Sequence, residues 1–274
     1  MMKLKYTFAI GILVLAGCSN PSEFGISPQS TGRVVFDLSK NNDAGNADWR
    51  IDGAYSSWAE ALRAEGYSVS QITGTVSPSS LSGASVYIIP EPQRPFSDSE
   101  RAAIANFVQN GGSLLMISDH RVSDRDNDGW DSPEVFNGWD GKSPTSVASQ
   151  LQTGLDSDGL FGITHSFKSS YSDPVYTATP VTSHPVLQGV DEVGVYVGTS
   201  LELKRSARAL LASGGKTYLA SSFHGSGRVL AWGDSSTFGD NTYSDGSTGK
   251  YNDWVLLDNA QLGINMVRWL AGDL

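Results

Sequence analysis

The stretch SVYIIPEPQRPFSDSERAAIANFVQNGGSLLMI, residues 85–117, decides the fold. It opens with a continuous apolar run at 85–89, which ends at Pro90, and it closes with a second apolar run at 113–117. Continuous runs of this length are typical of strands that are buried on both faces of a parallel sheet. The two runs therefore predict two neighbouring parallel strands.

The residues between the two runs predict the crossover helix. Ser97 and Glu100 have the spacing of a capping box, in which each side chain accepts a hydrogen bond from the other residue's backbone. Ile104, Phe107 and Val108 then place an apolar stripe on one face of the helix.

The same alternation of strands and helices continues on both sides of this stretch. A helix is expected around Trp58 and a closing helix over 257–270, and further strands are expected at 33–38, 67–72, 194–197, 217–221 and 228–232. This order predicts a single α/β domain with a doubly wound, mostly parallel, flavodoxin-like sheet. Right-handed crossovers would then gather the strand-end loops at one edge of the sheet.

The amino-terminal segment is typical of an exported lipoprotein. Lys3 and Lys5 precede an apolar run at 8–15 that is too short to cross a bilayer. The sequence Leu15-Ala16-Gly17-Cys18 resembles the bacterial lipobox, although an ordinary signal peptide with an incidental cysteine stays an alternative. The resemblance implies a signal peptide at 1–17, an acylated Cys18, a tether at 18–31 and a folded domain at 32–274.

The lipobox resemblance also implies a location. Two or more acyl chains, palmitate among them, would hold the protein at a membrane. Ser19 follows the cysteine where inner-membrane lipoproteins usually carry Asp. We therefore expect a lipid-anchored protein of the outer membrane, facing the periplasm or the cell surface.

Composition narrows the function classes. The chain has a formal net charge of -10, which argues against nucleic acid as a partner because nucleic acid requires clustered Lys and Arg. Cys18 is the one cysteine of the sequence. The folded domain therefore has no disulfide, thiolate metal site or cysteine nucleophile.

Five segments together resemble the class I glutamine-amidotransferase-like fold, in the branch with gliding-motility and intraflagellar-transport type domains. They are the first strand with its loop, Ile89-Pro90-Glu91-Pro92, the helix end and strand over 107–120, Ser183–Val190 and Gly227–Ser235. The resemblance implies an α/β domain that lacks the catalytic cysteine, in a branch that is largely non-catalytic. Where the nucleophile would stand, the strand ends in Ser118-Asp119-His120.

An acidic loop follows this strand. The sequence DRDNDGWD at 124–131 matches the first half of a calcium loop, in which oxygens at alternate positions converge on a hard cation. The twelfth position is Val135, which departs from the EF-hand pattern. The metal candidates are Asp124, Asp126, Asp128, Asp131 and Glu134, and a solvated acidic loop is the alternative.

The predicted strand ends supply a second set of candidates, because ligands of open α/β sheets bind at the carboxyl ends of the strands. Asn42, Asp43 and Glu91 would line a ligand-binding edge. In an enzyme reading, a carboxylate beside an imidazole could bind a metal or orient a base, and a serine could act as nucleophile. The candidates for that chemistry are Asp119, His120, His224, Asp234 and Ser235. Polar helix caps at the strand ends are the structural alternative.

Two functional hypotheses follow. The first is a lipid-anchored envelope module that binds a ligand, glycan or protein without catalysis, with calcium as a stabilising ion. The second is a metal-assisted envelope hydrolase that uses the strand-end Asp and His residues. The absence of a recognisable nucleophile favours the first.

Overall fold

The computed structural model describes residues 32–120, 123–136, 160–165 and 176–274. Its central sheet is half parallel and half antiparallel. The parallel half has the order β2-β1-β3-β4-β11. Its strands are β1 (Arg33–Asp37), β2 (Ser68–Ile72), β3 (Val86–Pro90), β4 (Ser113–Ile117) and β11 (Gly227–Trp232).

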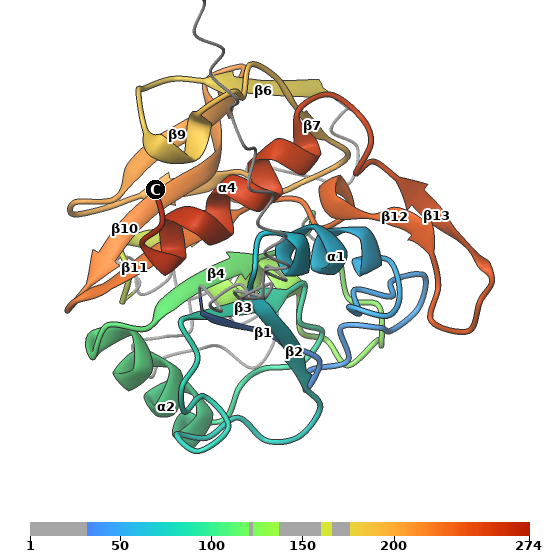
Figure 1. The fold of residues 1–274 in the computed structure, drawn as a ribbon, viewed down its shortest axis with the longest axis vertical. Helices are drawn as coiled ribbons and strands as arrows, with labels where there is room; N and C mark the ends of the chain where they lie inside the picture. Colours follow the sequence, from blue (N-terminus) through green and yellow to red (C-terminus); the bar gives the residue numbers. More distant parts are fainter. Residues whose placement is uncertain (1–31, 121–122, 137–159, 166–175) are drawn as a thin grey trace, which may run out of the picture.

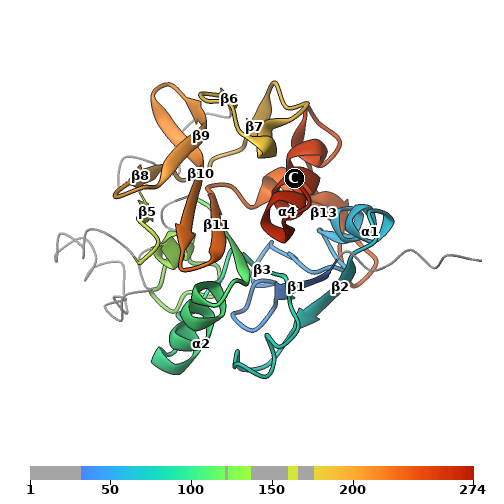
Figure 2. The same cartoon turned by 60° about the vertical axis from the view of Figure 1, so that its left-hand side comes forward.

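The antiparallel half continues from β11 through β10, β9, β6 and β7, while β5 and β8 pair beside β10 (Figure 2). Its strands are β5 (Ile163–His165), β6 (Tyr176–Pro180), β7 (Val193–Val195), β8 (Leu201–Leu203), β9 (Arg208–Ser213) and β10 (Lys216–His224). The predicted α/β class is confirmed. The flavodoxin-like, doubly wound arrangement is not, because half of the sheet is antiparallel.

Helices cover both faces of the parallel half (Figure 1). Helices α1 (Ser56–Ala64) and α4 (Asn259–Ala271) pack on one face through Trp58 and Leu262. Helix α2 (Asp98–Gln109) packs on the other face through Ile104 and Val108. Alternate residues of each central strand point into these two separate cores, which explains why the central runs are apolar throughout.

The capping box of α2 forms as the sequence predicts. The Ser97 hydroxyl accepts from the Glu100 backbone N–H at 3.3 Å, and the Glu100 carboxylate accepts from the Ser97 N–H at 2.8 Å. Glu100 also receives Lys40 Nζ at 2.8 Å, so one buried carboxylate connects the helix start to the loop after β1. These contacts fix the segment that leads from β3 into α2.

A short hairpin of β12 (Asp240–Thr242) and β13 (Thr248–Asn252) projects beside α1 and the start of α4 (Figure 1). The closing helix starts later than its apolar pattern predicts. Leu257 lies outside α4, is 53% exposed and has a φ of 49°. Among the helices of the described residues, none is long and apolar enough to cross a membrane.

Candidate functional site

The carboxyl ends of the parallel strands gather polar side chains at one edge of the sheet, here called the carboxyl edge. Glu91 follows β3, Asp119 follows β4, and Asp234 and Ser235 follow β11. All four residues are at most 4% exposed. Parallel pairing thus brings together residues that lie far apart in the sequence.

Glu91 is the centre of a buried network. Its carboxylate accepts from Arg125 Nε at 2.6 Å, Ser123 Oγ at 2.5 Å, Ser235 Oγ at 2.7 Å and the indole N–H of Trp49. Its backbone φ of 38° lies in the left-handed region, which is uncommon for a non-glycine residue. Burying a carboxylate requires such compensation by donors and a cation.

Arg125 supplies the cation and joins the two acids. Its guanidinium binds both oxygens of Glu91, and its Nη2 donates to Asp119 Oδ2 at 2.7 Å. Although burial disfavours the charge, Glu91 and Asp119 raise the pKa of Arg125. The guanidinium side chain is 10% exposed, so the ion pairs lie largely out of solvent.

His120 extends the network toward the surface. Its Nδ1 lies 2.9 Å from Asp119 Oδ1. Burial alone would favour the neutral forms of both side chains. The contact with Asp119 nevertheless raises the pKa of His120. The contacts with His120 and the charge of Arg125 lower the pKa of Asp119. At neutral pH the group is therefore an ionised Asp119 held between an imidazole and a guanidinium.

Ser235 has no exposed surface, and its hydroxyl lies between the two acids. Its Oγ donates to Glu91 Oε2 at 2.7 Å and lies 3.1 Å from Asp119 Oδ2. Tyr55 donates to the Ser235 carbonyl at 2.8 Å. A hydroxyl in this environment stabilises the neighbouring carboxylates, whereas a nucleophile must be reachable by substrate.

Asp234 lies next to Ser235 but faces another part of the molecule. Its Oδ1 accepts from the Ser236 N–H at 3.0 Å and the Ser236 hydroxyl at 2.8 Å, and its Oδ2 accepts from the Tyr196 N–H. Burial and the charge of Asp119 raise the pKa of Asp234 to about 8. The residue anchors the β7–β8 connection to the end of β11.

We expect the domain to lose stability as the pH rises from 5 to 9. Asp234 has its raised pKa in the folded state only, so its contribution is complete below the ordinary value of 3.8 and is lost as the pH passes about 8. The raised pKa of His120 acts in the same direction. Melting temperature should fall by roughly 2–4 °C for each kcal/mol lost.

Thermal melting across this pH range is the measurement. Asp234→Asn cannot titrate and should flatten the pH slope, whatever its effect on the melting temperature at any single pH. A slope that Asp234→Asn leaves unchanged would contradict the assignment.

His224 does not join the network, and the expectation that it lies at the same edge is wrong. It ends β10, which is antiparallel to β11, and it pairs with Gly227 at the start of that strand. The carboxyl end of an antiparallel strand lies at the opposite edge of the sheet. His224 is accordingly beside Phe161, with ring centroids 5.4 Å apart.

Asn42 and Asp43 lie at the carboxyl edge in different roles. Asn42 is buried, and its Nδ2 donates to the Pro90 carbonyl at 2.5 Å, which joins the loop after β1 to the end of β3. Asp43 is at the surface, 3.4 Å from Arg50. Of the three predicted ligand-edge residues, Glu91 is the one that enters the network.

The acidic loop brings three of its five predicted metal ligands together. Oxygens from Asp124, Asp126 and Asp128 lie within 4.8 Å of one another. Asp131 is buried outside this group, and the side chain of Glu134 lies outside the described part of the structure. The loop therefore brings together three of the five carboxylates that were predicted to bind a cation.

Protein groups already bind parts of this cluster. Asp126 accepts from Arg94 at 2.9 Å and Asn41 at 2.7 Å, while Asp124 accepts from the backbone N–H groups of Asp128 and Gly129. Partial burial and the charges of its two neighbours raise the pKa of Asp128. The three acids thus repel one another, as expected for a site that a cation would stabilise.

The network residues that sequence reasoning missed are Arg125, Ser123, Trp49 and Tyr55. Arg125 lies inside the predicted calcium loop, where one arginine among alternating acids is the available signal. Trp130 and Trp232 near this edge are at most 2% exposed, so both rings are part of the core.

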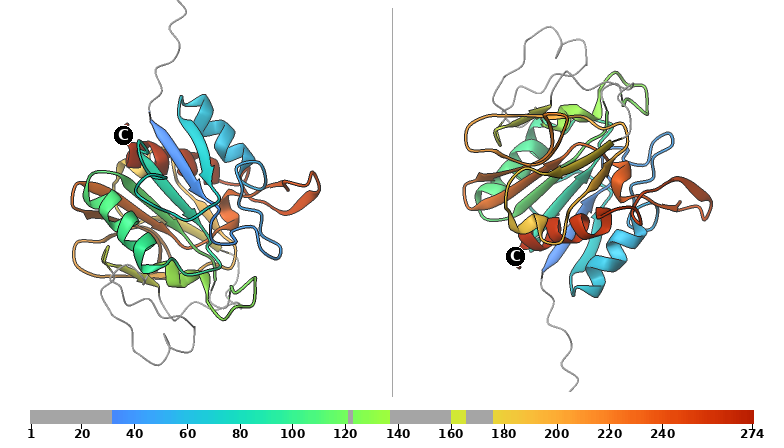
Figure 3. Two further views of the ribbon diagram at one scale, coloured as in Figure 1. Left: turned by 90° about the horizontal axis from the view of Figure 1, so that it is seen from below. Right: turned by 90° about the horizontal axis from the view of Figure 1, so that it is seen from above.

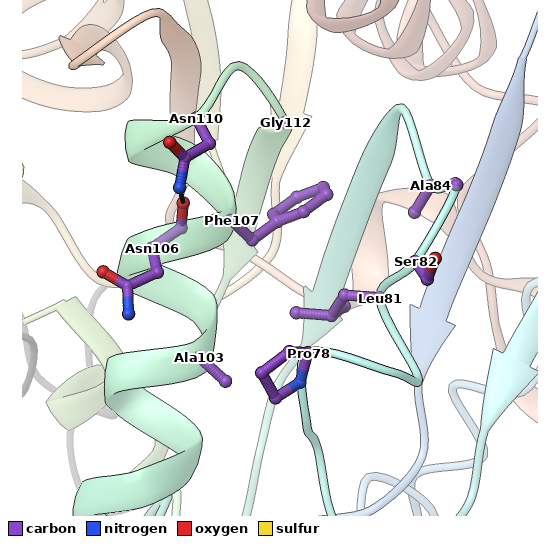
Figure 4. A pocket seen from close by; sticks show the side chains of 10 residues that line it. Pro78, Leu81, Ser82, Ala84, Ala103, Asn106, Phe107, Asn110 and Gly112 are labelled. Atoms are coloured by element: carbon purple, nitrogen blue, oxygen red, sulfur yellow. Dashed lines mark hydrogen bonds between the residues drawn. The ribbon is translucent and has the colours of Figure 1, made fainter.

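Two surface cavities lie away from the network. One of about 330 Å³ lies between α2 and the loop before β3, where Pro78, Leu81 and Phe107 face one another (Figure 4). The other, of about 630 Å³, is lined by residues between Pro180 and Val190. Neither is lined by Glu91, Asp119 or Ser235.

Comparison with known proteins places the domain in a family. The family model described as a domain of unknown function, DUF4350, matches residues 50–256. The chain belongs to the DUF4350 family. The matched range of this DUF4350 domain includes the network from Glu91 to Ser235, while Trp49 lies one residue before it. No curated protein matches the chain.

Solved structures share the fold of this DUF4350 domain. The mmIFT52 N-terminal domain is 14% identical, with a TM-score of 0.60 over 87% of this chain and 97% of that one. A cytoplasmic protein from Salmonella typhimurium LT2 is 13% identical, with a TM-score of 0.53 over 87% and 99%. A ThuA-like protein from Bacteroides uniformis is 12% identical, with a TM-score of 0.50 over 92% and 95%. At these identities the likeness concerns the fold alone.

Proposed function

We propose that this DUF4350 protein is a lipid-anchored cell-envelope module that binds a partner without catalysis. The observation that carries the proposal is the closed network at the carboxyl edge. Glu91 and Asp119 both pair with Arg125, and Ser235 between them has no exposed surface. The site where an amidotransferase-like domain would carry out chemistry is thus filled by the protein's own side chains.

The hydrolase alternative receives less support from the same geometry. It requires Asp119, His120, His224 and Asp234 to approach a common substrate or metal. His224 is at the opposite edge of the sheet, and Asp234 faces Tyr196 and Ser236.

Ser235→Ala distinguishes the two functions. In a structural network, loss of this hydroxyl leaves carboxylate oxygens with one donor fewer, which should cost about 1–3 kcal/mol of unfolding free energy. In a hydrolase, the variant would in addition abolish an activity that the wild type shows. Release of soluble fragments from isolated cell envelopes by the wild type, abolished in Ser235→Ala, would contradict the non-catalytic proposal.

An exposed aliphatic segment favours a protein over a glycan as the partner. Val255, Leu256 and Leu257 precede α4 and are 68%, 44% and 53% exposed. Leu257 is held in the left-handed backbone region, which costs about 1 kcal/mol or more for such a residue. Sugars stack on aromatic rings, whereas aliphatic surface of this kind is characteristic of protein contacts.

A photoreactive residue at position 256 tests this partner surface in cells. We expect a discrete adduct with one envelope protein, which Val255→Asp abolishes. The matched control is position 206, where the native serine is also exposed. Adducts of equal pattern at both positions, or none at position 256, would overturn the binding surface.

The anchor depends on Cys18, which lies with residues 1–31 outside the described part of the structure. Support comes from the lipobox sequence alone. Cys18→Ser should abolish palmitate labelling and shift the protein from the membrane to the soluble fraction. Labelling that persists in Cys18→Ser would reject this anchor.

We also propose that the acidic loop binds calcium, which would stabilise the domain. Millimolar calcium should raise the melting temperature, with about 2.7 kcal/mol of stabilisation at one hundred times Kd. Arg94 competes for Asp126 and is half-exposed, so Arg94→Gln should strengthen calcium binding. Asp126→Asn should remove the shift, while Asp98→Asn at an exposed position serves as control. A melting temperature that ignores both calcium and chelator would exclude the site.

A further inference from the structure

The edge opposite the network, here called the amino edge, is where the parallel strands begin. Arg33, Ser113 and Gly227 start β1, β4 and β11 there, and antiparallel β10 ends there at His224. Helix α4 also ends at this side. Figure 1 shows the end of β10 and the C-terminus on the side away from the β12–β13 hairpin.

The amino edge carries a group of apolar and basic side chains around the buried ring of Trp269, here called the Phe223 patch. Phe223 is 60% exposed, and its ring lies 5.9 Å from that of Trp269. His184 packs 4.9 Å from Trp269, and the Arg228 guanidinium lies 5.1 Å above the same ring. Its exposed members are Val181, Arg208 and Phe223, its partly exposed members are His184 and Arg228, and Trp269 lies beneath them at 5% exposure.

Further contacts connect the remaining members to this patch. Val181 is 54% exposed, and its N–H donates to the Leu210 carbonyl at 3.0 Å. Val181 therefore lies beside β9. Arg208 pairs with Ser221, two residues before Phe223 on the same side of β10. Burial lowers the pKa of His184, and the positive charges of Arg208 and Arg228 lower it further.

The charge of the two edges differs in sign. Arg33, Arg208 and Arg228 stand at the starts of β1, β9 and β11 on the amino edge. Arg268 adds a fourth cation near Glu65, and Asp273 is a second acid close to the C-terminus. The described carboxyl-edge residues at 41–53, 118–120 and 123–131 contain eight Asp and two Arg. An anionic surface would therefore attract the amino edge and repel the carboxyl edge.

The described chain enters the domain at the same amino edge. The Gly32 carbonyl accepts from the Ser68 N–H, and the neighbouring Tyr67 donates to Asp273 near the C-terminus. Figure 3 shows the start of β1 beside the C-terminus. A cysteine at position 18 would thus be linked to the domain on the side of the Phe223 patch.

We infer that the Phe223 patch lies against an anionic phospholipid surface and orients the domain with its carboxyl edge away from the membrane. The inference rests on the proposed lipid anchor at Cys18. Exposed rings enter the headgroup region while basic side chains bind lipid phosphates. This orientation leaves the acidic loop and the Val255–Leu257 segment accessible to a partner.

Depth-dependent quenching tests the orientation with the full chain. Acylation blocks the thiol of Cys18, so one introduced cysteine is the only reactive thiol. The variants are Val181→Cys and Phe223→Cys, with Leu256→Cys as the control at the other edge. Each is labelled with a polarity-sensitive dye and reconstituted in vesicles of phosphatidylethanolamine and phosphatidylglycerol that carry a lipid-borne quencher.

We expect quenching at positions 181 and 223 to exceed that at position 256 by about twofold or more. Arg208→Glu should lower the quenching at position 223 toward that at position 256, whereas Arg50→Glu at the carboxyl edge should not. On vesicles of neutral phosphatidylcholine, the protein with native Arg208 should show the same lowered quenching at position 223 as Arg208→Glu shows on the anionic vesicles.

The outcomes separate the two proposals. Protein that floats with the vesicles but shows equal quenching at all three positions overturns the orientation and leaves the anchor intact. Protein that is not acylated and does not float overturns the anchor together with this inference. Labels that stay in water and become shielded only on addition of an envelope protein would show that the patch binds protein, which also overturns the inference.

Discussion

Arg125→Met is expected to lower the free energy of unfolding by about 3–5 kcal/mol, because removing one partner of a buried ion pair leaves the other charge uncompensated. Arg125 binds both Glu91 and Asp119, and methionine would leave two buried carboxylates without their cation. Methionine keeps most of the side-chain volume, so the loss reports charge rather than packing. Chemical denaturation of the wild type and variant measures it.

Two comparisons keep this result interpretable. Arg50→Met removes a partly exposed arginine that pairs with Asp43 and Asp52, and it should cost less than about 1 kcal/mol. Adding Glu91→Gln to Arg125→Met removes one of the two unpaired acids and should recover part of the lost stability. A loss below that of Arg50→Met would mean that the network is not a stabilising ion cluster.

Gly233→Ala is expected to be the second large effect, at about 3 kcal/mol or more, the upper end of overpacking costs. A Cβ on Gly233 would lie 1.9 Å from the carbonyl oxygen of Thr199. The backbone cannot move away easily, because Gly233 donates to Tyr218 and accepts from the Thr199 N–H at 2.7 Å. The residue directly precedes Asp234 and Ser235, so the variant should also disturb the carboxyl edge.

Gly74→Ala is the matched control, since nothing lies within 4 Å of a Cβ at that position. Thermal melting should leave Gly74→Ala close to the wild type while Gly233→Ala melts much earlier. Equal melting temperatures for the two variants would show that the Thr199 backbone can move away from a side chain at position 233.

The elements that local sequence determines were predictable. The buried runs at β3 and β4 and the Ser97–Glu100 capping box depend on residues that are close in the chain, and all three form as expected. Which strands lie beside β3 and β4 in the sheet, and in which direction, depends on residues that are far away in the sequence. The antiparallel direction of β10 and the short strands β5, β6, β8 and β9 have weak or no periodic signals, which is why the sequence did not predict the antiparallel part of the sheet.

The candidate site shows the same division. Glu91, Asp119 and Ser235 were identifiable because each follows an apolar strand. Arg125 was not, since its role depends on how a loop folds back over the sheet edge. His224 was misplaced for a related reason: the sequence marks the end of a strand, but the direction of that strand follows from its pairing.

The position of β11 between β4 and β10 has a consequence for how the chain folds. Residues 114–117 pair with residues 229–232, so the parallel half of the sheet is complete only after most of the chain is available. Pairings this distant in sequence form slowly. Until β11 arrives, the outer edge of β4 presents unpaired backbone groups to other chains, and aggregation through that edge competes with folding.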